Sequence, residues 1–189
     1  MEEELTIEEQ NELLRIARES ISAQFKGPPP PEPLMQSQLL KENRGAFVTL
    51  HDKRHCLRGC IGSFMADKPL FKTIREMAVQ AAFHDPRFPS LEEEELADIH
   101  IEISVLSPLK EIEDVDEIEV GKHGIYIVKG FHCGTLLPQV AAECCWDRRT
   151  FLEHTCMKAL LPPDGWKEGA RILTYSAQIF SEIEPEHPE

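Results

Sequence analysis

Residues 57–62 (Leu-Arg-Gly-Cys-Ile-Gly) carry the residue types best suited to covalent chemistry in this chain. A cysteine thiolate is a strong nucleophile, and a nearby cation favours it over the neutral thiol. If residues 55–62 form a strand, Arg58 and Cys60 share one face at a backbone separation of about 6–7 Å, because a strand rises about 3.3 Å per residue. The alternation also places Cys56 on that face and sends Leu57 and Ile61 to the core.

Two glycines flank the cysteine. Gly59 and Gly62 weaken a strand, so they predict a bulge, a bend or a close approach by another backbone or a ligand. Because Arg58 also shares a strand face with Cys60, the two glycines favour an interpretation in which Cys60 is a reactive thiolate and Arg58 is the cation beside it. The alternative interpretation is a packed structural thiol beside a solvent-facing arginine.

A nucleophilic cysteine requires a base and a group that orients the base. His123 is the candidate base, because its flanking glycines allow the loop to approach a neighbouring strand. Glu102, on the polar face of a predicted strand, is the candidate orienting group. The predicted substrate contacts are Arg58, Gly59, Gly62, Asp85, Arg87 and Ser104. Arginine suits a carboxylate or phosphate. Alternatively, Asp85 and Arg87 pair across a turn, and the polar strand face is merely solvated.

Two other kinds of site are weighed against the enzyme. In a non-catalytic binding module, Arg58, Arg87 and backbone groups freed by the glycines would hold an anionic ligand or a partner's peptide. A zinc site would use residues drawn from His51, His55, Cys56 and Cys60. However, His55 and Cys56 point to opposite faces of a strand and the spacing fits no standard site. The sequence therefore predicts no metal, and no nucleotide-binding glycine motif predicts a cofactor.

Composition narrows the class of protein. The chain has 189 residues and a net charge of -14, which argues against partners such as nucleic acid or an anionic membrane surface. No apolar run approaches the roughly 18 residues of a membrane span. The acidic start is unlike a signal peptide, and six cysteines without one indicate reduced thiols. We expect a cytoplasmic protein of one domain, or of one domain with a small lobe.

The elements that must position these residues follow from periodicity and turn signals. The chain begins with a predicted helix over 6–26, capped by Thr6 and Glu9, and a proline-rich connector ends at residue 33. Residues 34–189 form the remaining domain. The further predicted elements are a hairpin within 47–62, helices over 69–83, 111–120, 139–145 and 149–160, and strands over 98–106, 125–128, 135–137 and 170–182. This order favours an α+β fold, mainly an antiparallel sheet packed with helices, over strict βαβ alternation.

The chain resembles the AMMECR domain family, named for the human AMME-syndrome candidate region. The signature of that family is intact at residues 57–62, and further matches keep the family's order across roughly residues 40–182. They are residues 46–50 (Ala-Phe-Val-Thr-Leu), 85–88 (Asp-Pro-Arg-Phe), 103–107 (Ile-Ser-Val-Leu-Ser), 121–124 (Gly-Lys-His-Gly), 136–140 (Leu-Leu-Pro-Gln-Val) and 177–180 (Ala-Gln-Ile-Phe).

The resemblance implies a larger and a smaller lobe that form a cleft holding the signature. It supplies no established reaction. It also implies an association with a Memo-type protein and a radical S-adenosylmethionine protein in a shared pathway. We therefore expect an enzyme that uses Cys60 as a thiolate nucleophile for group transfer on a small-molecule or protein substrate. The alternative is a binding module that works with those pathway partners.

Overall fold

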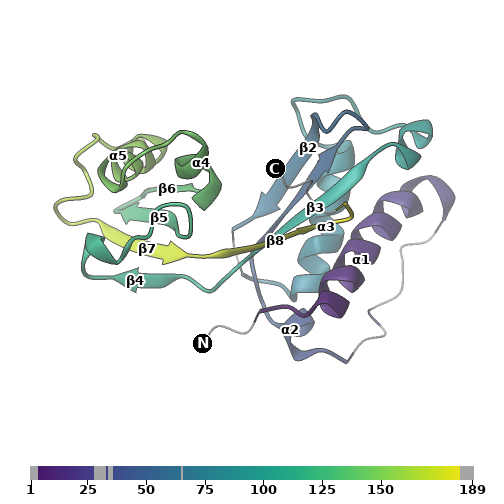
Figure 1. The fold of residues 1–189 in the computed structure, drawn as a ribbon, viewed down its shortest axis with the longest axis horizontal. Coiled ribbons are helices and arrows are strands. Elements are labelled where there is room, and N and C mark those ends of the chain that lie inside the picture. The colour runs from purple at the N-terminus through teal and green to yellow at the C-terminus, as the bar shows by residue number, and fades with distance from the viewer. Residues whose placement is uncertain (1–3, 28–32, 34–35, 65, 184–189) are drawn as a thin grey trace, which may run out of the picture. The chain divides into compact units, whose positions relative to one another are not determined.

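The computed structural model describes residues 4–27, 33, 36–64 and 66–183. The chain forms two compact units, each with its own four-stranded antiparallel sheet (Figure 1). Unit 1 comprises Met1–Leu106 and Gln178–Glu189, and unit 2 comprises Ser107–Ala177. The predicted α+β class is confirmed, whereas the expected cleft stays a prediction.

The sheet of unit 1 has the strand order β2-β1-β3-β8. Helices α1 and α3 pack against each other; α3 also packs on β1 and β2, and α1 on β3. The elements of unit 1 are α1 (Ile7–Lys26), α2 (Gln38–Lys41), β1 (Ala46–His51), β2 (Leu57–Ser63), α3 (Leu70–Phe83), η1 (Glu93–Ala97), β3 (His100–Leu106) and β8 (Ala177–Ser181).

Alternation along the strands decides which face of this sheet is covered. Val48, Leu50, Ile101 and Ile103 are fully buried in one hydrophobic cluster with residues of α1 and α3. The residues between them point to the opposite face. We call this second side the open face of the sheet.

Unit 2 has the strand order β4-β7-β5-β6. Helix α5 packs against β5 and β6, and α4 packs against β5. Phe151 and Leu152 of α5 are buried with Ile125 and Ile127 of β5. The elements of unit 2 are β4 (Lys110–Ile112), η2 (Val115–Glu117), β5 (Gly124–Lys129), β6 (His132–Leu136), α4 (Pro138–Glu143), α5 (Arg148–Lys158) and β7 (Arg171–Tyr175).

The predicted helices and strands are found close to their expected positions, with three differences. The single strand predicted over 170–182 is two strands, β7 and β8, because Ser176 leaves the ladder and bonds Ser107. The helix predicted over 111–120 is only the 3-10 turn η2, since Ile112 belongs to an edge strand. Residues 28–32 of the predicted proline-rich connector lie outside the described residues, so the connector is not one of these differences.

The third difference concerns the hairpin of β1 and β2. The pairing register shifts between Leu50, opposite Gly59, and His51, opposite Leu57. Arg58 is therefore the extra residue of a β-bulge. As a result Leu57, expected in the core, is 42% exposed, whereas Ile61 packs against the core as predicted.

Both glycines of the 57–62 stretch permit close approaches within the protein. A Cβ atom on Gly59 would lie 2.2 Å from the carbonyl oxygen of Ala81 in α3. One on Gly62 would lie 2.1 Å from the ring of Phe47. Of the explanations left open by the sequence, approach by another backbone therefore holds at Gly59, and an aromatic ring explains Gly62.

Substitution of Gly59 should destabilise unit 1. Gly59→Ala forces β2 away from α3, and overpacking of this kind costs about 1–3 kcal/mol. Gly130→Ala is a comparison, because its Cβ meets nothing within 4 Å and only its left-handed φ of 60° is unfavourable, at about 1–2 kcal/mol. Urea unfolding followed by far-ultraviolet circular dichroism measures both, and a smaller loss for Gly59→Ala than for Gly130→Ala contradicts the packing argument.

Candidate functional site

Three polar side chains form a row across the open face of the unit 1 sheet. Cys60 of β2 lies opposite Thr49 of β1, which lies opposite Glu102 of β3. The Thr49 hydroxyl donates a hydrogen bond to the Cys60 sulfur, with an Oγ1–Sγ distance of 3.2 Å. All three are partly exposed, and Glu102 has no hydrogen bond or ion pair with any described residue. We call these residues the Cys60 row.

The backbone of Cys60 is held from outside the sheet. β2 is an edge strand, and the loop after α3 supplies the missing partner. The Cys60 N–H donates to Asp85 Oδ2 at 2.9 Å, and the Cys60 carbonyl accepts from Arg87 Nη2 at 3.0 Å. Because both backbone groups point outward, Cys60 and Thr49 form a non-hydrogen-bonded pair, in which side chains approach most closely.

Asp85 and Arg87 pair with each other, as the turn interpretation predicted. Arg87 donates to both carboxylate oxygens, at 3.0 and 2.7 Å. The Asp85 side chain is 1% exposed and that of Arg87 is 54% exposed. The bond from Arg87, opposed by burial and aided by the Cys60 N–H, holds the pKa of Asp85 well below its usual range. The pKa of Arg87 is raised first by Asp85 and further by its interactions with Cys60.

Arg58 is engaged elsewhere. Its guanidinium forms a bidentate ion pair with Glu95 of η1 at 2.8 and 2.9 Å, and a further bond at 3.0 Å to the carbonyl of Pro89. The bond to Glu95 raises the pKa of Arg58 and lowers that of Glu95. Arg58 was the predicted cation beside Cys60, whereas Arg87, predicted as a substrate contact, is the arginine that bonds the Cys60 carbonyl.

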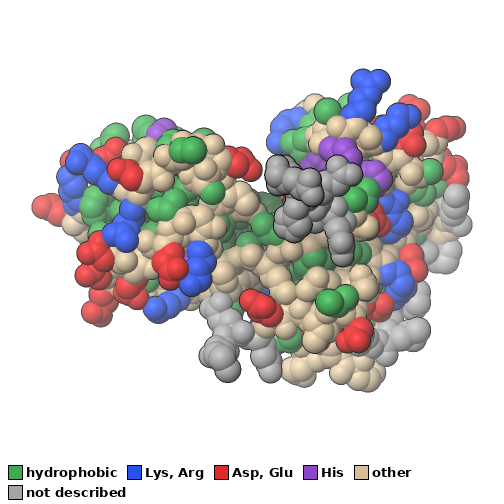
Figure 2. Space-filling model, viewed as in Figure 1, with side chains coloured by type: hydrophobic (Ala, Val, Ile, Leu, Met, Phe, Trp, Pro, Cys, Tyr) green, Lys and Arg blue, Asp and Glu red, His purple; other side chains and the backbone are tan. Residues whose placement is uncertain are grey.

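A histidine group lies beside the Cys60 row. His51 of β1 follows Thr49 on the same face and pairs with His100 of β3, whose ring stacks on that of His55 at 5.9 Å. Figure 2 shows histidine side chains gathered on unit 1. His51 is a diagonal neighbour of Cys60, a relation that spans about 7–8 Å between strands. Within the described chain, no group of three or more His, Cys, Asp or Glu residues is arranged to hold a metal ion.

The remaining predicted residues have other surroundings. Ser104 is buried on the same sheet face and lies opposite Phe47. His123 belongs to unit 2, where its Nδ1 accepts the N–H of Glu119 at 3.2 Å. Its role as a base stays a prediction. Sequence reasoning overlooked Thr49 as a site residue and considered His51 only as a possible zinc ligand, although both alternate in phase on the strand before the signature.

This fold and site belong to a known class of proteins. A family model described as AMMECR1 matches residues 14–180, so the chain belongs to the AMMECR1 family. Protein MK0488 of Methanopyrus kandleri is 44% identical over 199 residues, covering 100% of this chain and 95% of its own. Protein MJ0810 of Methanocaldococcus jannaschii is 42% identical over 193 residues, covering 96% of this chain and 94% of its own.

A solved structure has the same fold. The crystal structure of uncharacterized protein PH0010 from Pyrococcus horikoshii is 38% identical in sequence, with a TM-score of 0.78. The match covers 93% of this chain and 92% of that chain. The names of these relatives state no activity. In the described residues of this chain, no helix is long and apolar enough to cross a membrane.

The Asp85 contacts predict a defined pH dependence of stability. Because its pKa is lowered in the folded state, Asp85 stabilises the fold above the unfolded pKa near 4, and this contribution declines as the pH falls toward the folded value. Asp85→Asn should lower the unfolding free energy at pH 7 by about 2 kcal/mol, less than for a fully buried pair because Arg87 is half exposed.

The deficit of Asp85→Asn relative to the wild type should shrink below pH 4 by up to about 1.4 kcal/mol per pH unit. Denaturant unfolding at pH 7, 4 and 2.5 tests this expectation. Asp67→Asn is the control, because Asp67 is an exposed residue of unit 1 for which no ion pair is recorded. A deficit that stays constant with pH contradicts the assigned ionisation of Asp85.

Proposed function

We propose that this protein is a thiol-dependent group-transfer enzyme with Cys60 as its nucleophile. The observation that carries the proposal is the convergence of two polar contacts on one partly exposed cysteine. The Thr49 hydroxyl donates to its sulfur, and Arg87 bonds its carbonyl and interacts electrostatically with it. A hydrogen-bond donor and a cation both favour a thiolate.

Fixed geometry supports the same proposal. The bonds to Asp85 and Arg87 hold both backbone polar groups of Cys60, so the sulfur is presented from a rigid strand. A nucleophile held in position reacts with less entropic cost than a mobile one. The open face beside it offers Glu102 as a proton acceptor, with Thr49 between the two residues.

The proposed reaction is acyl transfer. The Cys60 thiol gives its proton through one bridging water to the Glu102 carboxylate, the Thr49 hydroxyl stabilises the sulfur as a hydrogen-bond donor, and the sulfur attacks the carbonyl carbon of an ester or thioester. The bond to the leaving group breaks, and the departing alcohol or thiol takes the proton from Glu102. A second nucleophile, water or an amine, then attacks the thioester on Cys60, restores the thiol and loses its own proton to the carboxylate.

The binding-module alternative loses part of its support. Its anion site relied on two free arginines and on backbone groups exposed at the glycines. Arg58 is paired with Glu95, Arg87 is paired with Asp85, and Gly59 faces the backbone of α3. Only the exposed edge of Arg87 remains for a charged substrate group.

Alkylation rates test the activation of Cys60. With iodoacetamide at pH 7, Arg87→Gln should slow the modification of Cys60 by about tenfold, since one nearby charge is lost. Thr49→Val should slow it several-fold and Thr49→Ser should restore it. Arg58→Gln is the matched control and should leave the rate within about twofold. Peptide mass spectrometry separates Cys60 from the exposed Cys56, which serves as the internal reference.

Circular dichroism establishes that each variant is folded, and an unchanged rate at the exposed Cys56 shows that the reagent acts equally on each variant. Thr49→Val differs from the wild type by one hydroxyl, so it remains informative if Arg87→Gln unfolds. If Arg58→Gln slows alkylation and Arg87→Gln does not, the cation is Arg58 and the assignment of Arg87 is wrong. If Cys60 stays unmodified in the folded wild type, it is a structural thiol.

Acyl transfer is tested with p-nitrophenyl acetate. We expect an acetyl group on Cys60 during turnover and no acetyl group at this position in Cys60→Ser. Glu102→Gln should slow the release of p-nitrophenol by at least about a hundredfold, which is the lower end of the range for loss of a general base. Glu94→Gln, an exposed carboxylate of η1, is the matched control. Acetylation confined to the exposed cysteines, with Cys60 free, contradicts the proposed reaction.

A further inference from the structure

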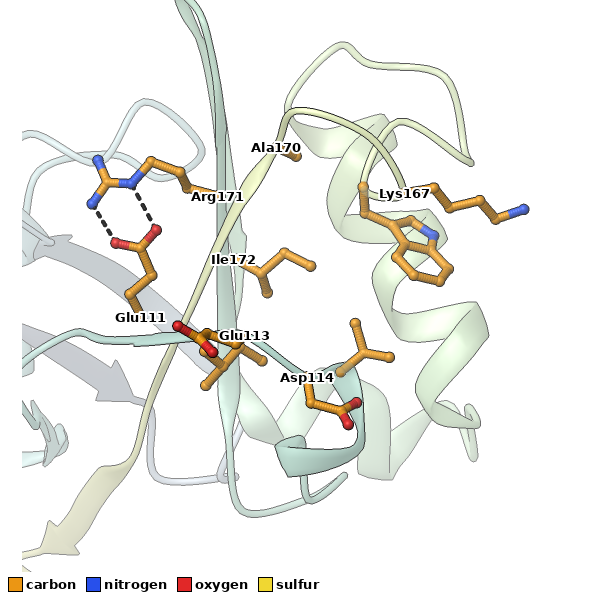
Figure 3. A pocket seen from close by; sticks show the side chains of 10 residues that line it. Glu111, Glu113, Asp114, Lys167, Ala170, Arg171 and Ile172 are labelled. Carbon is orange, nitrogen blue, oxygen red and sulfur yellow. Dashed lines mark hydrogen bonds and ion pairs between the residues drawn. The ribbon is translucent and has the colours of Figure 1, made fainter.

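A concave site lies wholly within unit 2, where β4 ends and β7 begins (Figure 3). Its volume is about 320 Å³, within the range of pockets that hold small ligands or single side chains. The residues that line it are Glu111, Ile112, Glu113, Asp114, Val115, Trp166, Lys167, Ala170, Arg171 and Ile172. None of them belongs to the Cys60 site.

The floor of the pocket is apolar and firmly held. Ile112 and Ile172 lie opposite each other on β4 and β7, and each is 8% exposed. Val115, Trp166 and Ala170 are partly buried and pack against the core of unit 2. Aliphatic and indole surfaces of this kind suit a chain of methylene groups.

The charges on the rim are unevenly compensated. Glu111 is neutralised by a bidentate pair with Arg171 at 3.0 and 2.7 Å. The Glu113 carboxylate makes no hydrogen bond or ion pair with a described residue, although the backbone of Glu113 hydrogen-bonds Glu117. The Asp114 carboxylate accepts the N–H of Asp116 at 2.9 Å, and its recorded contacts include no cation. The carboxylates of Glu113 and Asp114 are thus available to a cation, and a charge-assisted hydrogen bond to either is stronger than a bond between neutral groups.

The opposite wall offers hydrogen-bond donors. The indole Nε1 of Trp166 is buried and has no acceptor among the described residues, which is rare for a buried donor. The Lys167 ammonium lies 5.8 Å from the centroid of the same ring, and Figure 3 shows the Lys167 side chain running outward, away from Glu113 and Asp114. A ligand that carries a carbonyl oxygen at this end would supply the missing acceptor after a small shift of the ring.

We propose that this pocket binds a basic side chain, arginine or lysine, of a partner polypeptide. The methylene stem lies on the floor of Ile112 and Ile172, and the cation meets Glu113 and Asp114. The partner's backbone carbonyl faces the indole of Trp166. The excess of acidic residues in the chain, 34 against 20 basic ones, also favours approach by a basic partner. The proposal is independent of the chemistry at Cys60.

The test is a titration of the full-length ¹⁵N-labelled protein with N-acetyl-arginine amide, observed at the indole N–H of Trp166. Trp146→Phe assigns that resonance, since the chain has two tryptophans. We expect a saturable shift. N-acetyl-citrulline amide, which has the same shape without the charge, should bind at least about tenfold more weakly. n-Butylguanidinium, which lacks the peptide carbonyl, should also bind more weakly.

Two substitutions locate the binding. Glu113→Gln should raise the dissociation constant for N-acetyl-arginine amide by about tenfold, as expected for one lost charged hydrogen bond. Glu168→Gln, an exposed carboxylate outside the pocket lining, should change it by less than twofold. Equal binding of the citrulline compound, no effect of Glu113→Gln, or no shift at Trp166 overturns the proposal. If n-butylguanidinium binds as tightly as N-acetyl-arginine amide, the occupant of the pocket is a free organic cation and the proposed peptide partner is wrong.

Discussion

The buried carboxylate of Asp85 is the interaction on which the Cys60 site depends. It accepts the N–H of Cys60 and pairs with Arg87, which in turn bonds the carbonyl of Cys60. An edge strand normally exposes such backbone groups to water or to another chain. Here two side chains of one turn replace a neighbouring strand at a single residue. The same contacts that protect the edge also bring a guanidinium to the cysteine.

The two arginines near Cys60, Arg58 and Arg87, have different partners. Arg58 is the bulged residue of β2 and pairs with Glu95, which ties the hairpin to η1. Arg87 keeps half of its side chain exposed while its inner edge is fixed by Asp85. Proximity in sequence favoured Arg58 as the partner of Cys60, but a bulge changes the direction of a strand locally. The loop after α3 instead brings Arg87 to the carbonyl of Cys60.

Local patterns in the sequence were sufficient for most of the fold. The capping box of Thr6 and Glu9, the alternation in β3 and the apolar stripe of α3 each identify an element without tertiary information. The pairing of strands that lie far apart in the sequence could not be predicted from these local patterns. The alternating run at 170–182 continues through Ser176, so only the partners of each half show that it serves two sheets. For the same reason the sequence did not identify Thr49 as a site residue, because the cross-strand register determines its contact with Cys60.

Packing accounts for most of the signature at residues 57–62 and leaves its cysteine unexplained. Gly59 is required by the backbone of α3, and Gly62 by the ring of Phe47. Ile61 packs on the core. Cys60, in contrast, is partly exposed and its recorded side-chain hydrogen bond comes from a hydroxyl; a serine or alanine would meet the same backbone contacts with Asp85 and Arg87. A residue whose identity the fold does not require is best explained by its chemistry, and the chemistry peculiar to cysteine is that of its thiolate.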